Sequence, residues 1–307
     1  MISFRFHLVS LVAVFMALGV GVLTGTTVIN RGVVSRLESQ TDALSTDLDA
    51  LRGQLGELQG ESEVWGAFGE EAIAPLLAGR LTEQQVVLIT QDGTSEESVA
   101  GIRRAIEAAG GEIIALISVA PKMALPTEAD REGLASILGA DATEEPEALA
   151  LEAAQLVAER LAEGPTGTDT LEQLLDGDFL LIQSSGLTET GLRALGGPDQ
   201  AIVAVAGGPA PSPLEPERFL VPLVTDLAAA GISVAAAEPF EGGEQEPPFV
   251  TMLRGEAGIS PLISTQDNVD QLPGQLGLAL ALEDLLQGQP GHYGVKDGAS
   301  RALPELP

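Results

Sequence analysis

The sequence predicts an α/β protein with a single N-terminal transmembrane helix, a coiled-coil stalk and a doubly wound, mostly parallel sheet domain. A long uncharged run near the start, a leucine heptad after it, and strand patterns alternating with helical patterns predict this order. The segments that we expect are a short cytoplasmic head (1–7), the transmembrane helix (8–29), the coiled-coil stalk (30–66), a linker (67–82), an extracytoplasmic α/β domain (83–290) and a flexible tail (291–307).

The membrane helix is predicted from the run Leu8–Ile29, which holds no ionisable side chain. About 20 apolar residues in a helix span the hydrocarbon core of a bilayer. The alternative is a cleaved signal peptide, which has a shorter apolar core and an Ala-x-Ala-like cleavage site. No such site follows here, so we favour a retained anchor. A head of so few residues cannot hold a domain, which places it in the cytoplasm and the bulk of the chain outside.

Two features of this N-terminal region predict a homodimer. Gly21 and Gly25 form a G-x-x-x-G pair, which lets two membrane helices approach closely. A heptad of leucines from residue 34 to residue 65 is typical of a two-stranded parallel coiled coil. The leucines at its two seam positions are Leu37, Leu44, Leu48, Leu51, Leu55 and Leu58. The alternative is one amphipathic helix that packs back on its own domain.

The domain after the stalk reads as alternating strands and helices. Val86–Thr90 and Glu112–Val119 are apolar strand patterns, and the helical pattern Ser95–Ala109 stands between them. Strand, helix and strand in this order form a βαβ unit, which implies a parallel sheet covered on both faces. Further strands are expected at 179–183, 201–206, 232–237 and 262–264, and further helices at 127–139, 145–163, 188–195, 214–230 and 274–287.

Composition excludes several classes of function. The net charge is −30 and the isoelectric point is near 4.1, so the surface repels nucleic acid. The chain has no cysteine, which removes disulfides, thiolate metal ligands and cysteine nucleophiles.

No enzyme is predicted, because the catalytic motifs are missing. The loops that follow predicted strands include residues 91–94 and 207–209, but neither carries a dinucleotide or P-loop fingerprint. A Ser–His–Asp set of Ser185, His292 and Asp267 can be written down, yet Ser185 lacks the G-x-S-x-G elbow and no spacing supports the set.

Metal ligands are sparse in the predicted domain. Soft metals such as Cu(I) prefer Cys, Met and His. The candidates here are His292, Met123 and Met252, which lie far apart in the sequence. The acidic turn around Asp267 and Asp270 lacks calcium-loop spacing, so we read it as a turn or helix cap. No cofactor is evident from the residues.

Both ends of the chain resemble one known family. The start, MISFRFHLVSLVAVFMALGVGVLTG, and the later stretch ISTQDNVDQLPGQLGLALALEDLLQGQPGHYG resemble the MctB family of mycobacterial-type copper transport proteins, also discussed as SteB. The resemblance implies a role in copper homeostasis or transport at the envelope of actinobacterium-like cells, and copper is implied by it alone. It carries over no catalytic residues.

The residues themselves favour a different role from carrying copper. One membrane helix encloses no pore, and the uncharged anchor offers no ion relay. The alternative is therefore a non-enzymatic coiled-coil scaffold that joins a membrane or septal protein partner in septum or envelope assembly.

Overall fold

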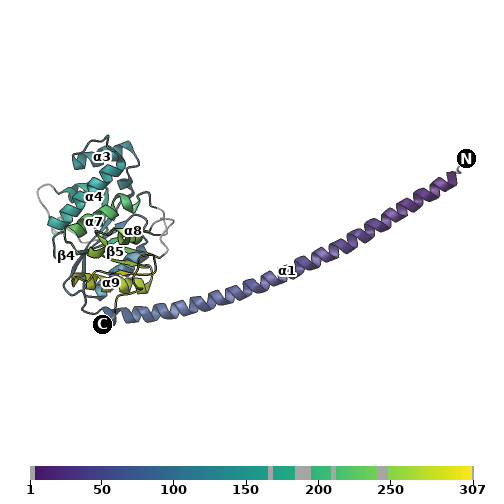
Figure 1. Ribbon diagram of the computed structural model, residues 1–307, viewed down its shortest axis with the longest axis horizontal. Coiled ribbons are helices and arrows are strands. Elements are labelled where there is room, and N and C mark those ends of the chain that lie inside the picture. The colour runs from purple at the N-terminus through teal and green to yellow at the C-terminus, as the bar shows by residue number, and fades with distance from the viewer. Residues whose placement is uncertain (1–3, 165–168, 184–194, 209–211, 241–247, 306–307) are drawn as a thin grey trace. The chain divides into compact units, whose positions relative to one another are not determined.

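A computed structural model describes residues 4–164, 169–183, 195–208, 212–240 and 248–305. Contacts divide the chain into two units, Met1–Trp65 and Gly66–Pro307. The first unit is formed by a single helix, α1 (Phe4–Leu77), whose last turns belong to the second unit (Figure 1).

The end of α1 differs from the linker that we expected at 67–82. The helix continues past Pro75 to Leu77. Leu77 and Leu81 are buried in the core of the second unit, and Ile73 packs against the same core. Because most helical stability in proteins comes from packing of an apolar face, this burial offsets the hydrogen bond that Pro75 cannot make.

The second unit is built on a seven-stranded sheet with the order β3-β2-β1-β4-β5-β6-β7. The strands are β1 (Gln85–Gln91), β2 (Glu112–Val119), β3 (Leu180–Ile182), β4 (Gln200–Val205), β5 (Val234–Glu238), β6 (Ser264–Asp267) and β7 (His292–Tyr293). Every neighbouring pair is parallel except β2 and β3, which are antiparallel. The predicted α/β class with a mostly parallel sheet is confirmed.

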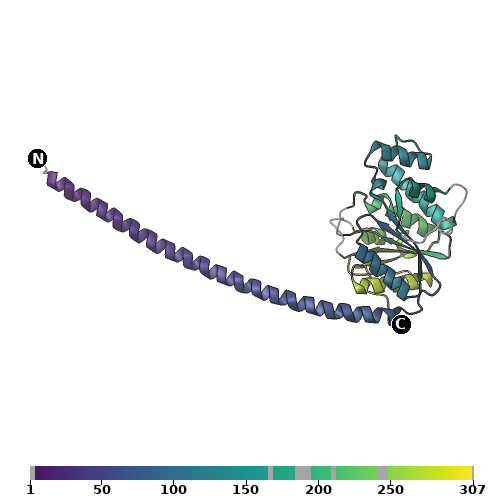
Figure 2. The same ribbon diagram turned by 180° about the vertical axis from the view of Figure 1, so that it is seen from behind.

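Helices cover both faces of this sheet (Figures 1 and 2). They are α2 (Glu96–Ala108), α3 (Glu128–Leu138), α4 (Pro146–Glu163), α5 (Thr170–Asp176), α7 (Leu220–Ala229), α8 (Phe249–Gly255) and α9 (Leu272–Leu286). Alternate strand residues such as Val87 and Ile89 join the core beneath α3, α4, α5, α7 and α8. Their neighbours Val86 and Leu88 join the core beneath α2 and α9. This alternation explains why the parallel strands read as continuous apolar runs.

Several elements depart from the sequence-based expectations. The predicted helix over 214–230 is a short 3₁₀ turn, Pro216–Arg218, followed by α7. The helices α5 and α8 and the strand β7 were not predicted. The predicted helix at 188–195 lies almost wholly outside the described residues.

The C-terminal segment also differs from the flexible tail expected at 291–307. β7 pairs with β6 in parallel, and Tyr293 forms a further bridge with Arg301. Residues 292–301 therefore complete one edge of the sheet.

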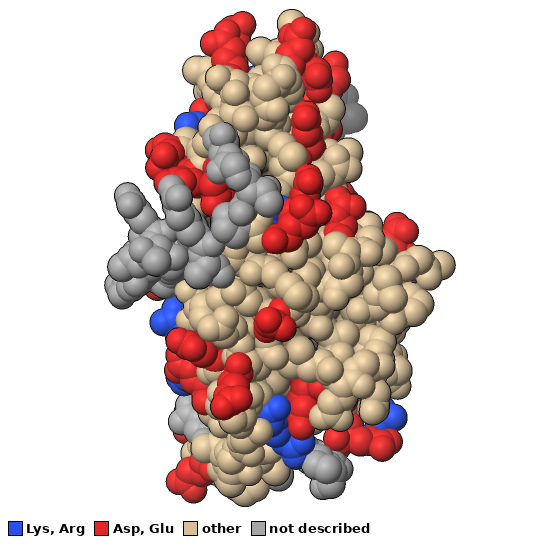
Figure 3. Space-filling model, turned by 90° about the vertical axis from the view of Figure 1, so that its left-hand side faces the viewer, with Lys and Arg blue, Asp and Glu red and all other residues tan. Residues whose placement is uncertain are grey.

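Acidic side chains are scattered over the face of the molecule drawn in Figure 3, and basic side chains are seen in few places. The distribution agrees with the net charge of −30.

Candidate functional site

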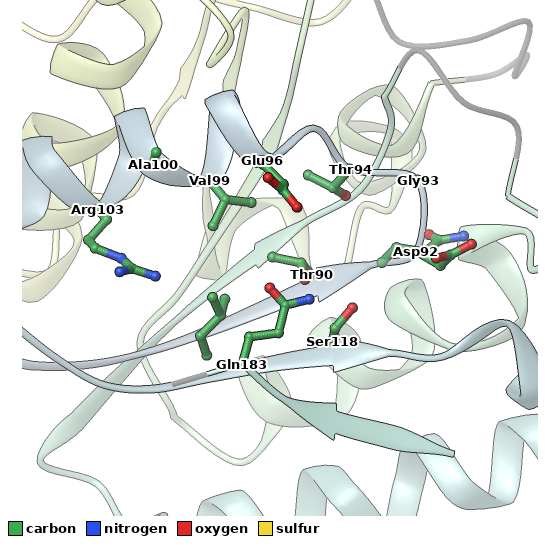
Figure 4. A pocket seen from close by; sticks show the side chains of 12 residues that line it. Thr90, Asp92, Gly93, Thr94, Glu96, Val99, Ala100, Arg103, Ser118 and Gln183 are labelled. Atoms are coloured by element: carbon green, nitrogen blue, oxygen red, sulfur yellow. The ribbon is translucent and has the colours of Figure 1, made fainter. Parts of the chain in front are cut away.

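A cavity of about 340 Å³ lies at the carboxyl ends of β1 and β2, beneath the first turns of α2 (Figure 4). Its lining residues are Thr90, Gln91, Asp92, Gly93, Thr94, Glu96, Val99, Ala100, Arg103, Leu116, Ser118 and Gln183. In Figure 4, Glu96, Val99 and Arg103 extend from α2 toward Gln183 and Ser118. Carboxyl ends of parallel strands are where open α/β sheets bind ligands.

The cavity lies on the β2 side of β1 because the β4 side is closed. Strand order reverses between β1 and β4, which is the usual position of a ligand crevice. Here the loops after these two strands meet: a Cβ on Gly208 would lie 1.9 Å from the carbonyl oxygen of Gly93. Only glycine permits this approach, and it leaves the opening between β1, β2 and α2.

Two hydroxyls inside the cavity have no hydrogen-bond partner in the described part of the chain. Thr90 and Ser118 are register partners on β1 and β2, and their residues are only 3% and 7% exposed. Thr90 lies two residues after Leu88 on β1, and Ser118 lies two residues after Leu116 on β2. Because alternate strand residues share a face, both face the α2 side of the sheet, as Leu88 and Leu116 do.

The hydroxyl oxygens of Thr90 and Ser118 are open to the cavity, whereas two other lining atoms, Gln91 Oε1 and Thr94 Oγ1, are fully buried without a described partner. Buried polar atoms are normally paired. Two accessible hydroxyls on the cavity floor, with two unpaired polar atoms in the same lining, are what a ligand-binding site would present.

A second polar cluster lies at the carboxyl ends of β5 and β6. Arg254 and Asp267 form an ion pair whose side chains are 3% and 0% exposed, at 3.1 Å. Asp267 also accepts the backbone N–H groups of Val295 and Lys296, at 2.6 and 3.0 Å. Lys296 reaches Glu238 at 3.0 Å. Burial raises the pKa of Glu238, against the opposing charge of Lys296.

This cluster holds the C-terminal segment against the sheet. Arg254 donates to the carbonyl oxygens of Tyr293, Lys296 and Asp297 as well as to the side chains of Thr265 and Asp267. A guanidinium with this many acceptors is well compensated for the loss of water. We interpret the cluster as a structural clamp.

His292 lies beside this clamp on β7. Its Nε2 is 2.8 Å from the Ser260 hydroxyl and its Nδ1 is 3.1 Å from the Thr265 hydroxyl. Burial and the nearby positive charge of Arg254 lower the pKa of His292. Both ring nitrogens are thus engaged by hydroxyls, and neither is directed to a described carboxylate.

The candidate metal ligands do not form a cluster. Met123 is fully buried in the core beneath α4, and Met252 on α8 packs against the same core while partly exposed. His292 has the two hydroxyl partners given above. Among the described residues, no group of three or more His, Cys, Asp or Glu side chains could hold a metal ion.

The Ser–His–Asp set is not supported by this geometry. Ser185 lies outside the described residues. Asp267, which we read as part of an acidic turn, instead ends β6 and is paired with Arg254, at 3.1 Å.

The seam leucines of α1 are exposed within the single chain. Leu44, Leu51 and Leu58 are 62%, 54% and 61% exposed, and Leu48 and Leu55 are similarly exposed. The side chain of Leu37 lies outside the description. Around Gly21 and Gly25 a Cβ would find nothing within 4 Å.

One described helical segment, Phe6–Gly25, is long and apolar enough to cross a membrane. A signal sequence near an N-terminus passes the same test.

Comparison with known proteins decides the family. A model of the family described as "Copper transport outer membrane protein, MctB" matches residues 1–304. This chain belongs to the MctB family. Proteins named "Copper transporter MctB" from Mycobacterium bovis and Mycobacterium tuberculosis are each 27% identical to it, over 97% of this chain and 98% of theirs. The protein of that name from Mycobacterium leprae is 28% identical over 98% of each chain.

The structure explains the C-terminal motif that carried the MctB resemblance. A Cβ on Gly274 would lie 2.1 Å from the carbonyl oxygen of Asn268, and one on Gly277 would lie 2.3 Å from Oε1 of Gln266. These glycines let α9 pack directly on β6. The motif therefore builds one edge of the domain.

Proposed function

We propose that this chain is a single-pass, membrane-anchored envelope protein with a role in copper homeostasis or transport. The match over residues 1–304 carries this proposal, because it includes the apolar helix, α1 and the domain together. The family description and the relatives' names supply the copper role. No reaction is part of the proposal, and we regard the protein as non-enzymatic.

The proposed orientation places the head in the cytoplasm and the domain outside. Because the chain has no cysteine, a single cysteine at the exposed Ala148 can be labelled cleanly. A membrane-impermeant maleimide should label A148C in intact cells. Labelling only after lysis would contradict the orientation.

We further propose that α1 forms a two-stranded parallel coiled coil. The exposed leucines lie seven residues apart, and exposed apolar seams of this kind are buried by a second helix. One anchor per chain cannot enclose a path across a membrane. A copper role would therefore require assembly, and the dimer is its first step.

The copper role can be tested in cells that lack this protein. We expect such cells to accumulate copper, measured by mass spectrometry of washed cells, and the full-length chain to restore the normal content. A chain that lacks residues 1–65 should not restore it, although its domain is intact. Unchanged copper content in the deletion strain would reject the role.

A scaffold without bound copper is the second candidate. It is favoured by the exposed seam and by the dispersed positions of His292, Met123 and Met252. Titration of Cu(I) into the full-length protein separates the two. Tight stoichiometric binding that is lost in H292A would favour copper carrying. Absence of binding, together with co-purification of a membrane or septal protein through residues 1–65, would favour the scaffold.

A further inference from the structure

We propose that the cavity between β1, β2 and α2 binds a small neutral polyhydroxylated ligand, of the chemical class of a monosaccharide. This site is separate from the membrane anchor, the seam of α1 and the clamp around Arg254. The proposal begins from the floor of the cavity, where Thr90 and Ser118 lie side by side. Neither hydroxyl has a hydrogen-bond partner among the described residues, and both are open to the cavity. In the same lining, Gln91 Oε1 and Thr94 Oγ1 are fully buried without a described partner, which is unfavourable.

The charges around the cavity argue against a charged ligand. Asp92 and Glu96 line it, so an anion would meet two carboxylates. Arg103 also lines it, and the N-terminus of α2, with its partial positive charge, lies above it; both disfavour a cation. None of these three side chains forms an ion pair with another described residue, so all three are available to a ligand.

The remaining lining fits a molecule with several hydroxyl groups. Thr90, Ser118 and the amide of Gln183 can each donate and accept hydrogen bonds. A sugar hydroxyl also does both and so matches this mixed set. Val99 and Leu116 supply apolar surface for the C–H face of a sugar ring. The volume of about 340 Å³ is at the small end of ligand pockets, which indicates a single ring.

Ligand-observed saturation-transfer NMR tests the proposal on the full-length protein in lipid nanodiscs, which avoid sugar-containing detergents. The neutral probes are glucose and N-acetylglucosamine, the anionic probe is inorganic phosphate, and the cationic probe is spermidine. We expect saturation transfer to at least one neutral probe at millimolar concentration and none to the charged probes above the level of empty nanodiscs.

Two variants connect binding to this cavity. The double variant T90V/S118A removes both hydroxyls at nearly constant volume, and should raise the Kd at least about fivefold. A100W fills the cavity from an exposed position on α2, and should abolish binding. A148W, the same change at an exposed alanine on α4, is the control and should bind as the unaltered protein does.

Each other outcome would overturn the proposal. Transfer to neither neutral probe would reject the ligand class, and binding of phosphate or spermidine that A100W abolishes would assign the cavity to a charged ligand. Binding of a neutral probe that survives both A100W and T90V/S118A would place it elsewhere. Circular dichroism shows whether A100W has folded; if it has not, T90V/S118A decides the result.

Discussion

Arg254 and Asp267 are joined through a single carboxylate oxygen: both terminal guanidinium nitrogens lie 3.1 Å from Oδ2 of Asp267. Because Oδ1 accepts the N–H of Val295 at 2.6 Å, the same carboxylate also fixes the chain after β7. The ion pair thus links α8, the end of β6 and the C-terminal segment.

Loss of one partner of this pair should be costly. D267N leaves Arg254 buried without its counter-charge, and we expect it to lower the free energy of unfolding by about 3–5 kcal/mol. Hydrogen exchange of residues 292–301 should accelerate together with this loss. Urea denaturation measures the first and mass spectrometry the second. The double variant R254M/D267L removes both charges and should recover part of the lost stability. If its loss in free energy of unfolding equalled the summed losses of the two single variants, the pairing would be contradicted.

Gly294 permits the close approach of the segment to Asp267. Its φ is +124°, and a Cβ would lie 2.1 Å from Cγ of Asp267. G294A should therefore destabilise the protein by more than about 2 kcal/mol. A shift of the backbone or of the buried Asp267 carboxylate to make room for the methyl group would cost free energy. Thermal unfolding measures the effect.

The matched control for Gly294 is G258A. Gly258 has no atom within 4 Å of a built Cβ and no left-handed φ, so its replacement should change stability by at most about 0.5 kcal/mol. Equal effects of the two substitutions would show that the close approach to Asp267 is not what requires glycine at position 294.

Two buried strand threonines make a second matched pair. Thr265 bonds Arg254 at 2.8 Å and His292 at 3.1 Å, whereas Thr90 has no partner among the described residues. T265V should cost about 1–3 kcal/mol because it leaves the Arg254 Nε–H unpaired. T90V should be neutral or stabilising, since no hydrogen bond is lost. Chemical denaturation of both variants checks this, and a large loss of stability in T90V would show that its hydroxyl has a partner.

These contacts show which parts of the fold the sequence could predict. The apolar runs that became β1, β2 and β4 are buried on both faces, so hydrophobicity alone reveals them. β6 reads Ser-Thr-Gln-Asp and is just as buried, yet the expected strand there was only 262–264. Its burial is made possible by Arg254, Val295 and Lys296, which pair with Asp267. None of these partners belongs to the strand itself, so the local sequence pattern does not predict the strand.

The candidate site was predictable only in part. Residues 91–94 were expected at a carboxyl end of the sheet, and they do line the cavity. Its floor was not expected, because Thr90 and Ser118 read as ordinary ends of strands. Their juxtaposition depends on the register between β1 and β2, which the sequence does not specify. The closure of the usual crevice by Gly93 and Gly208 also depends on tertiary contact.

His292 should make stability depend on pH. Its folded-state pKa is lowered, first by burial and then by Arg254, so its contribution is fully present above its ordinary value of 6.5 and is lost as the pH falls through the lower, folded value. Glu238 acts in the opposite sense, because its raised pKa favours the folded state as the pH falls toward 4.5 and below.

The two groups can be separated by substitution. Melting temperatures of the unaltered protein and of H292N, measured from pH 7.5 to 5.5, should diverge: on acidification the unaltered protein should lose stability relative to H292N. Parallel curves would show that burial and Arg254 do not lower the pKa of His292 in the folded protein. E238Q is the control for the carboxylate, because glutamine keeps an acceptor oxygen but does not ionise. In E238Q the pH dependence of the melting temperature that His292 causes should remain.

The seam of α1 gives the last prediction. In a parallel in-register coiled coil, Leu44 of one chain faces Leu44 of the other, so a disulfide can form between cysteines placed there. L44C and L51C should yield covalent dimers on mild oxidation in membranes, whereas G53C, on the outer face of the same heptad, should yield few. The absence of native cysteine makes the bands unambiguous. Equal yields at all three positions would indicate random collision. No covalent dimer at any of them would mean that the exposed leucines do not pack against a second copy of this helix.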